Sequence, residues 1–231
     1  MKKISPKAKI AETAVIHDDV EIEEDVVIRD YVVIYPGTVV KAGAELYDHC
    51  VLGKLPTSPG STARTYGSEY GKTVIGENCI LCPGVILYTG TTIGHNTLLG
   101  DNCSIREKCE VGDYCIISRN VSVNYETTIG NHTKIMDNSH ITGNMRIGNH
   151  VFISVLVAST NDNSMGRESD AAERLSGPVV EDYATIGAGA SLLPGVVVGA
   201  NAVVGASALV TKNVPAGKVV MGIPARVIRD I

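Results

Sequence analysis

Aliphatic side chains recur at every sixth position along most of the chain, and this spacing determines the fold that we expect. The pattern runs in three blocks, over residues 4–52, 75–153 and 180–210. A period of six fits neither the 3.6-residue period of a helix nor the two-residue alternation of a simple strand. It predicts a short strand and a corner that repeat three times in each turn of a triangular, all-β solenoid.

The position four residues after each aliphatic marker is mostly small, which predicts that it fills the narrow space where two walls meet. Such corners leave little room for large rings, and the 231 residues include no Trp, one Phe and 24 Gly. Five of the six cysteines occupy this position, namely Cys50, Cys79, Cys103, Cys109 and Cys115. We interpret them as reduced thiols that pack in the core, with a metal thiolate site as the alternative.

Two hydrophilic stretches rich in Gly, Pro and Ser interrupt the repeat, at residues 53–72 and 158–178. We expect both to be loops outside a single prism-shaped domain that spans residues 1–231, and loops on rigid scaffolds often carry binding sites. Residues 212–231 leave the repeat again. They predict a cap over the exposed edge of the last coil, which could include a short helix after Pro224.

Charge and composition exclude several classes of function. The formal net charge is −5, so the chain has no broad cationic surface for a nucleic-acid backbone. No segment approaches the roughly 20 apolar residues of a membrane span, and the N-terminus lacks the apolar stretch of a secretory signal. We therefore expect a cytoplasmic protein with neither nucleic acid nor a membrane as a partner.

The repeat resembles that of the hexapeptide-repeat acyltransferases over nearly the whole chain. The resemblance implies a left-handed parallel β-helix with about eighteen residues in each coil, a handedness that the general rule for parallel crossovers would not predict. It also implies a homotrimer with active sites between subunits. Residues 186–228 look like the coenzyme A-binding end of this family, so the implied co-substrate is acetyl-CoA.

Small residues in this C-terminal run suit a pantetheine arm, because a bulky side chain would hold it away from the exposed peptide groups. These residues are Gly187, Ala188, Gly205 and Ala206. Three cations, Lys212, Lys218 and Arg226, could meet the phosphates, and Pro224 belongs to the closing Gly-Ile-Pro-Ala-Arg run. The alternative is that the glycines and alanines only serve the corners.

His140 directly precedes the marker Ile141, so we expect it to point outward from a wall, one coil from the start of the second loop. Asp137 and Asn138 are its neighbours. The resemblance to relatives that acetylate nucleotide-linked amino sugars implies that these three residues approach the acceptor amine. An imidazole with a pKa of about 6.5 suits removal of a proton, and a carboxylate can orient the amine. A solvated wall residue is the alternative for His140.

The second loop resembles the Thr/Ser-Asn-Asp-Asn-x-x-Gly-Arg run of the amino-sugar N-acetyltransferases. Its run from Ser159 to Arg167 contains no histidine, which relatives that acetylate hydroxyl groups commonly carry near this loop. The resemblance implies an amine acceptor that is bound by Asn161, Asp162, Asn163 and Arg167.

The first loop is similar to the Leu-Gly-Lys-x-Pro start of an insertion in nucleotide-sugar relatives. Lys54, Arg64 and Tyr66 could supply charge to a diphosphate and an aromatic face to a nucleobase. The loop could equally contact another subunit.

Together these features predict an acyltransferase that acetylates the amino group of a nucleotide-diphospho amino-deoxy sugar by direct attack on acetyl-CoA, without a metal. Amino-acid N-acyltransferases share the fold and the donor. A γ-class carbonic anhydrase would hold zinc through histidines, and His132 and His150 lie eighteen residues apart, but no two of the six histidines are five apart, as in that family. A non-catalytic trimeric scaffold would bind no coenzyme A.

Overall fold

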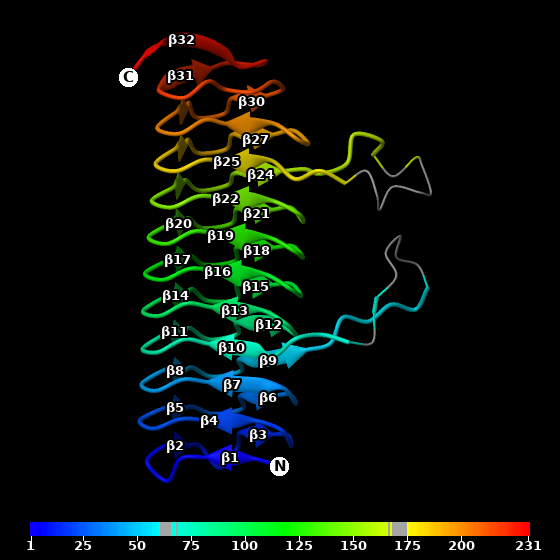
Figure 1. Ribbon diagram of the computed structural model, residues 1–231, viewed down its shortest axis with the longest axis vertical. Coiled ribbons are helices and arrows are strands. Elements are labelled where there is room, and N and C mark those ends of the chain that lie inside the picture. The colour runs from blue at the N-terminus through cyan, green and yellow to red at the C-terminus, as the bar shows by residue number, and fades with distance from the viewer. Residues whose placement is uncertain (61–65, 68, 166, 168–174) are drawn as a thin grey trace.

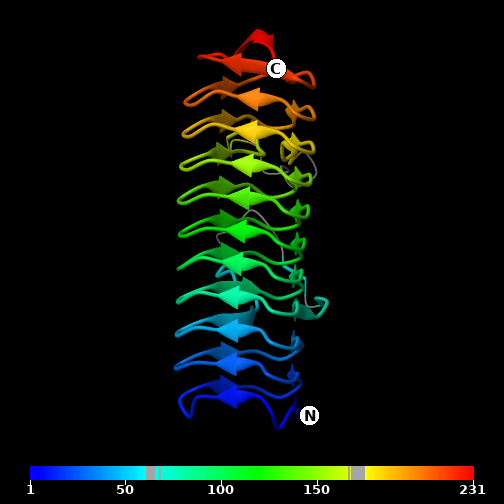
Figure 2. The same ribbon diagram turned by 90° about the vertical axis from the view of Figure 1, so that its left-hand side faces the viewer.

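The chain folds into a long triangular prism of stacked coils (Figure 1). The structure is a computed structural model, and it describes residues 1–60, 66–67, 69–165, 167 and 175–231. Within these ranges the chain forms strands β1 to β32 and no helix. Each coil places one strand on each of three walls, and a second view shows the same narrow, regular stack (Figure 2). The left-handed parallel β-helix predicted from the hexapeptide resemblance is therefore confirmed.

Three parallel sheets form the walls of the prism. Wall A contains β1 (Lys3–Ile4), β4 (Glu21–Ile22), β7 (Thr38–Val40), β10 (Thr73–Ile75), β13 (Thr92–Ile93), β16 (Glu110–Val111), β19 (Thr128–Ile129), β22 (Arg146–Ile147), β25 (Val179–Val180) and β28 (Val197–Val198). Wall B contains β2 (Lys9–Ile10), β5 (Val27–Ile28), β8 (Glu45–Leu46), β11 (Ile80–Leu81), β14 (Leu98–Leu99), β17 (Ile116–Ile117), β20 (Lys134–Ile135), β23 (Phe152–Ile153), β26 (Thr185–Ile186), β29 (Val203–Val204), β31 (Lys218–Met221) and β32 (Arg226–Asp230). Wall C contains β3 (Val15–Ile16), β6 (Val33–Ile34), β9 (Val51–Lys54), β12 (Ile86–Tyr88), β15 (Ser104–Ile105), β18 (Ser122–Val123), β21 (His140–Ile141), β24 (Ala158–Ser159), β27 (Ser191–Leu192) and β30 (Leu209–Val210).

The aliphatic markers fill the interior, and the small residues four positions later close the corners. Leu46, Leu81 and Ile117 are fully buried, and the five cysteines at the small position are buried beside them. All six cysteines are free thiols, and burial raises the pKa of Cys50 to about 12 and that of Cys79 to about 11. The five buried thiols therefore act as small core residues, as the sequence predicted, whereas Cys82 is only partly buried.

Most corners turn at a residue in the left-handed backbone conformation, which favours Asn and Gly. At the corner between walls A and B, hereafter the AB corner, this position also stacks rings. Tyr114 lies 5.1 Å from His132, His132 lies 4.7 Å from His150, and His150 lies 4.7 Å from Tyr183, measured between ring centroids. His132 and His150, which are eighteen residues apart, therefore stack on one another. Within the described residues no three His, Cys, Asp or Glu side chains gather into a possible metal site.

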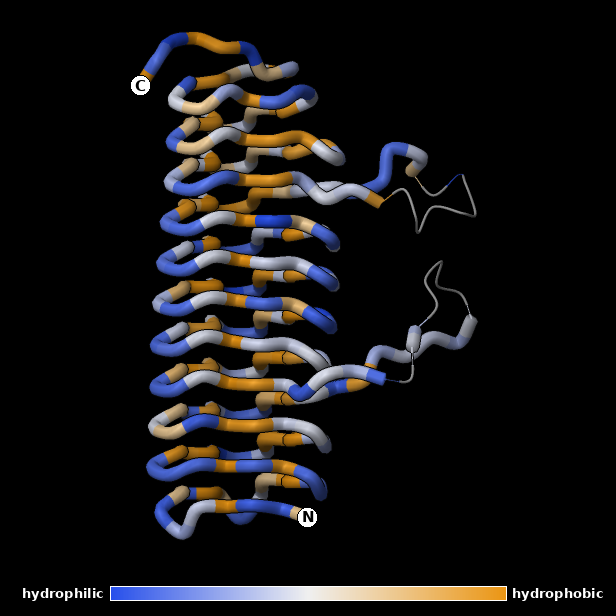
Figure 3. Tube along the Cα trace, viewed as in Figure 1, coloured by the Kyte–Doolittle hydropathy of each residue, from blue (hydrophilic) through white to orange (hydrophobic). Residues whose placement is uncertain are grey.

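Both interruptions leave the prism at the same corner, between walls C and A, hereafter the CA corner. Loop 1 lies between β9 and β10, and loop 2 lies between β24 and β25. Their described parts project from the same side of the stack (Figure 1) and are mainly hydrophilic (Figure 3). The two loops are separated along this corner by only four intervening coils, which brings them toward a common region.

The C-terminal segment differs from the helix that we considered after Pro224. Residues Arg226–Asp230 form β32, which pairs antiparallel with β31 at the end of wall B. The last coil would otherwise leave a row of unpaired peptide groups, and a strand satisfies them directly whereas a helix would not. The described part of the chain contains no helix that is long and apolar enough to cross a bilayer.

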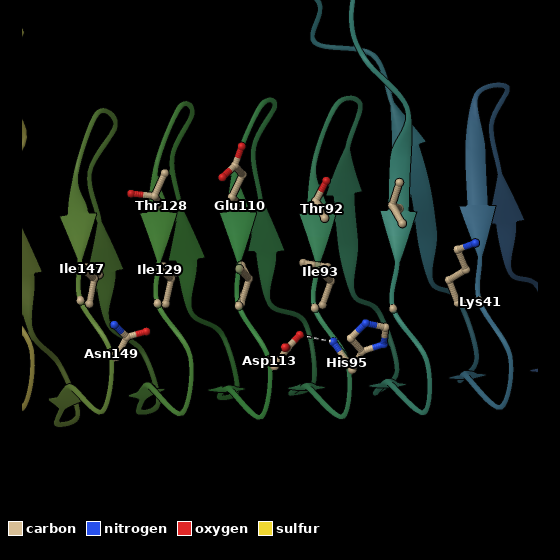
Figure 4. A pocket seen from close by; sticks show the side chains of 17 residues that line it. Lys41, Thr92, Ile93, His95, Glu110, Asp113, Thr128, Ile129, Ile147 and Asn149 are labelled. Carbon is tan, nitrogen blue, oxygen red and sulfur yellow. Dashed lines mark hydrogen bonds between the residues drawn. The ribbon is translucent and has the colours of Figure 1, made fainter.

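A column of glycines marks the start of the AB corner and forms the floor of a groove of about 670 Å³ on wall A (Figure 4). Gly94, Gly112 and Gly130 belong to this column, and a Cβ at Gly130 would lie only 2.6 Å from the carbonyl carbon of Gly148 in the next coil. Beside the column, the backbone N–H of His95 donates to Asp113 Oδ1 at 2.7 Å (Figure 4). The groove is thus a consequence of the close stacking of coils.

Substitution of Gly130 by Ala should destabilise the prism, because the added methyl group would push two coils apart. We expect a loss of about 1–3 kcal/mol in the free energy of unfolding, measured by urea denaturation. Gly71→Ala is the control, since a Cβ there meets no atom within 4 Å. Equal stability of the two variants would contradict the stacking argument.

Candidate active site

His140 begins β21 and lies on the outer surface of wall C, where it is partly buried. The next residue, Ile141, points into the core and is fully buried, as the hexapeptide register predicts. The Nδ1 atom of His140 is 2.8 Å from Oγ of Ser122, its neighbour one coil below. Nε2 has no hydrogen-bond partner among the described residues, so one ring nitrogen is held while the other is available.

Burial lowers the pKa of His140 below its usual value of 6.5, since a charged imidazolium is poorly solvated on this part of the wall. The ring is therefore mainly neutral at pH 7. If Nδ1–H donates to Ser122 Oγ, the lone pair of a neutral ring lies on Nε2, which can then accept a proton. Ser122, which we had not expected from the sequence to take part, is the residue that holds Nδ1, and it favours this tautomer when its hydroxyl oxygen accepts the bond.

Asp137 lies at the corner between walls B and C, hereafter the BC corner, and it forms an ion pair. Its carboxylate accepts hydrogen bonds from the Arg119 guanidinium at 2.5 Å, from the Arg119 backbone N–H at 3.2 Å, and from Ser118 Oγ. The hydrogen bond from Arg119, followed by that from Ser118, lowers the pKa of Asp137. Asp137 is thus a fixed anion and a weak base, better suited to orienting a cation or an amine than to removing a proton.

Asn138 lies at the same corner in the left-handed backbone conformation, with φ of 59°. Asn adopts this conformation more readily than most residues, which explains its presence here structurally. No hydrogen bond joins Asp137 or Asn138 to His140 in the described structure. The three residues that we expected to act together therefore lie on one coil, but Asp137 and Asn138 are at the BC corner, whereas His140 is on wall C.

The small residues of the C-terminal coils continue the BC corner above Asp137. Backbone hydrogen bonds link Leu156 N–H to Asp137 O at 3.1 Å, Gly189 N–H to Val155 O at 2.9 Å, and Ser207 N–H to Ala188 O at 2.8 Å. One edge, hereafter the BC edge, therefore rises from Asp137 along this corner. It contains Gly187, Ala188, Gly205 and Ala206. Gly187 also has a packing role, because a Cβ there would meet the backbone nitrogen of Ala206 at 2.5 Å.

The Gly-Ile-Pro-Ala-Arg run folds over the top of this edge. Ala225 N–H donates to Leu209 O at 2.8 Å, and Leu209 N–H donates to Gly222 O at 3.0 Å, so Pro224 and Arg226 lie near the BC corner. The other two predicted phosphate ligands lie elsewhere. Lys212 follows β30 at the CA corner, and Lys218 at the start of β31 is ion-paired with Asp230.

Loop 2 is fastened to the coils beneath it through Asn161. Its Nδ2 group donates to Gly143 O at 3.2 Å and to the Tyr125 hydroxyl at 3.4 Å. A Cβ at Gly143 would lie 2.6 Å from the Tyr125 ring, so this glycine lets the ring lie against the corner. Asn161 therefore has an anchoring role, and Tyr125 is a neighbour that sequence reasoning missed.

The remaining predicted residues of loop 2 differ in their surroundings. Asp162 Oδ1 accepts hydrogen bonds from the backbone N–H of Ser164 at 2.7 Å and from its hydroxyl at 2.6 Å, which shapes a tight turn. Asn163 and Arg167 are exposed. Among these residues, Asn163 and Arg167 are the more accessible to a ligand.

Loop 1 packs against the two coils above it. The Tyr66 hydroxyl accepts a hydrogen bond from Arg106 Nη2 at 3.2 Å, and Lys54 Nζ lies 5.2 Å from the centre of the Tyr88 ring. Arg64, the third predicted residue of this loop, lies outside the described residues. No sequence motif singled out Arg106, although it follows the wall C marker Ile105, two coils above Lys54.

Three comparisons with known proteins fit this arrangement. The bacterial transferase hexapeptide family, which is described by six repeats, matches residues 90–124 and 177–212. A 2,3,4,5-tetrahydropyridine-2,6-dicarboxylate N-acetyltransferase of Staphylococcus aureus is 54% identical over 52 residues. That match spans 22% of this chain and 22% of the relative's own length.

Solved structures match over far more of the chain at lower identity. A UDP-N-acetylglucosamine acyltransferase of Arabidopsis has a TM-score of 0.61 at 21% identity, covering 96% of this chain and 74% of that one. The enzyme of the same description from Campylobacter jejuni has a TM-score of 0.64 at 13% identity, covering 96% and 75%. These likenesses establish the fold. The repeats within residues 90–124 and 177–212 thus match the hexapeptide-repeat transferases, and the β-helix is the fold of these solved acyltransferases.

Loss of the Ser122 hydroxyl should change the protonation pattern of His140. In Ser122→Ala we expect a mixture of tautomers in place of a dominant Nδ1–H form, observed in long-range ¹H–¹⁵N spectra of the imidazole rings. Ser104→Ala is the matched control, because it removes the equivalent hydroxyl one coil further from the ring. An unchanged His140 spectrum in Ser122→Ala would show that Ser122 does not select the tautomer.

Proposed function

We propose that this protein is an acyl-CoA-dependent N-acyltransferase. The observation that carries the proposal is the neutral, partly buried His140, which is held at Nδ1 by Ser122 and lies between the BC edge and the two loops. An acceptor amine would attack the thioester carbonyl, forming a C–N bond. Nε2 would take the proton that the amine loses, the C–S bond would break, and the departing thiolate would leave as coenzyme A after protonation.

The donor would lie along the BC edge. Ala188 and Ala206 leave the peptide groups of that edge open to a pantetheine arm, and Arg226 is exposed near its upper end for the phosphates. Acetyl-CoA is the donor that we propose, in keeping with the name of the S. aureus relative. A homotrimer in the cytoplasm, in which a second subunit closes the site, completes this proposal.

The acceptor that we propose is a nucleotide-diphospho amino-deoxy sugar. Loops 1 and 2 support it, because they place cations, tyrosines and amides around one corner, which suits a charged and partly aromatic ligand. The UDP-N-acetylglucosamine acyltransferases share only the fold at their level of identity, so the loops carry this argument.

A second acceptor class has its own support. The S. aureus relative is named for a dicarboxylate, and a small dicarboxylate amine is therefore the rival substrate. Release of coenzyme A from acetyl-CoA separates the two classes. The panel comprises nucleotide-linked 3-amino and 4-amino deoxy sugars alongside amino acids and amino dicarboxylates. Turnover with a nucleotide sugar supports the first class, and turnover with a dicarboxylate alone overturns it.

Replacement of His140 by Gln should lower kcat by about 10²–10⁴-fold with the fold retained, because the wall C residues that pair with it, Ser122 and Ala158, are not bases. In the wild type, kcat/KM should rise with pH and level off above a pKa lower than 6.5, since the base acts in its neutral form and burial favours that form. Asp137→Asn should reduce turnover less, because Asp137 can orient the amine but is a weak base. Wild-type activity in both variants would remove this site assignment.

A bulky residue on the BC edge should interfere with the donor alone. Ala188→Leu should raise the KM for acetyl-CoA by about tenfold or more, with the KM for the acceptor unchanged. Ala200→Leu is the control, because Ala200 holds the equivalent position at the AB corner and is similarly exposed. The same effect from both substitutions, or from neither, would argue against a donor site on the BC edge.

A further inference from the structure

A cluster of cations and tyrosines lies where loop 1 meets the CA corner, and the catalytic proposal leaves its members beyond Lys54 and Tyr66 without a role. It comprises Lys54, Tyr66, Tyr70, Tyr88, Arg106, Glu107 and Lys108. Lys54, Tyr88 and Arg106 come from successive coils, so their side chains stack along the corner. Loop 1 adds the two remaining tyrosine rings.

Arg106 has a structural role at the centre of this cluster. Its guanidinium carbon lies 4.7 Å from the Tyr88 ring centre and 5.8 Å from that of Tyr66. Arg106 Nε also donates to the Glu107 carboxylate at 2.8 Å, and Glu107 is 1% exposed. A carboxylate buried to this extent requires a paired cation, so the charge of Arg106 is neutralised and its faces are occupied.

The charge of Lys54, in contrast, is not neutralised by a carboxylate in the described part of the chain. At Gly53, with φ of +75°, the register of β9 against β12 shifts by one residue, so that Lys54 pairs with Tyr88. Its Nζ lies over that ring at 5.2 Å, which is an attractive contact that leaves the three N–H donors free for an anion.

Lys108 stands on the same corner, two residues beyond Arg106. Its Nζ lies 5.7 Å from the Tyr70 ring centre and 4.0 Å from Glu126 Oε1, and both members of that pair are about half exposed. An exposed pair at this separation is weak, so an incoming anion can compete for the lysine.

We infer that Lys54 and Lys108 form the anion subsite of the acceptor, and that they bind its diphosphate. Lys54 lies two coils below Arg106 and Lys108 lies two residues beyond it, so both ammonium groups belong to the same corner, where each would contact one phosphate group. Tyr66 and Tyr70 belong to the packing of the subsite. The inference rests on the proposed transferase function, and it identifies the feature that would favour a nucleotide-linked acceptor over a small dicarboxylate.

The test is a direct binding measurement without acyl donor, by isothermal titration calorimetry on the full chain. The probes are UDP, dTDP, inorganic pyrophosphate, uridine and pimelate, a seven-carbon dicarboxylate. Wild type should bind the two nucleotides and pyrophosphate, with affinity that falls as salt rises. Binding of uridine or pimelate alone, with no binding of pyrophosphate or either nucleotide at millimolar concentration, would overturn the inference.

The variants assign the binding to the two lysines. Lys54→Met and Lys108→Met should each weaken UDP and pyrophosphate binding by about tenfold, and Lys54→Arg should retain most of it. Lys134→Met, which removes an exposed lysine from wall B, is the matched control and should bind as the wild type does. Wild-type affinity in the Lys54→Met and Lys108→Met variants would overturn the assignment, and unchanged melting temperatures would show that each variant is folded.

Kinetics separate this inference from the broader proposal. In an active enzyme, Lys54→Met should raise the KM for the nucleotide-sugar acceptor and leave the KM for acetyl-CoA unchanged. Transfer activity with an unchanged acceptor KM would contradict the proposed subsite but would support the transferase function. Pyrophosphate binding through the two lysines without any acyl transfer would support the subsite but contradict the transferase function.

Discussion

The whole structure depends on the register of eighteen residues that stacks each peptide group on its counterpart in the next coil. Hydrogen bonds such as Gly130 N–H to Ile147 O at 2.8 Å hold successive coils together, and the same register places aliphatic markers above one another in the interior. Any residue at the tightest corner positions must lack a side chain, as the glycine column shows. The interior therefore leaves no room for a buried active site.

This constraint moves all chemistry to the outside of the prism. Outward-facing side chains repeat at eighteen-residue intervals, so a functional residue meets its partner from the coil above or below. His140 with Ser122 and Asp137 with Arg119 are two instances. Burial lowers the pKa of His140, whereas hydrogen bonding to its partner lowers the pKa of Asp137. A base is kept neutral on the wall, while a carboxylate is kept charged at the corner.

Much of the stacking in the prism could be predicted from the sequence, because residues eighteen apart lie above one another. The stacking of His132 on His150 and the burial of the cysteines come directly from the six-residue period. The ion pair of Asp137 could have been found in the same way, since Arg119 lies eighteen residues before it. The strand at Arg226–Asp230 was missed because an edge can be satisfied by more than one kind of segment.

Contacts of the loops follow from this eighteen-residue spacing only where the chain is still in register. Asn161 is thirty-six residues, or two coils, from Tyr125, so this contact could have been found from the repeat. Tyr66 is forty residues from Arg106, and this contact does not follow from the repeat. Both loops leave and rejoin the prism at the CA corner, with four coils between them. Because wall C runs from the BC edge to this corner, His140 lies between the place proposed for the donor and the place proposed for the acceptor. A rigid stack with variable loops at one corner can therefore keep one base and one donor edge while the loops determine which acceptor is bound.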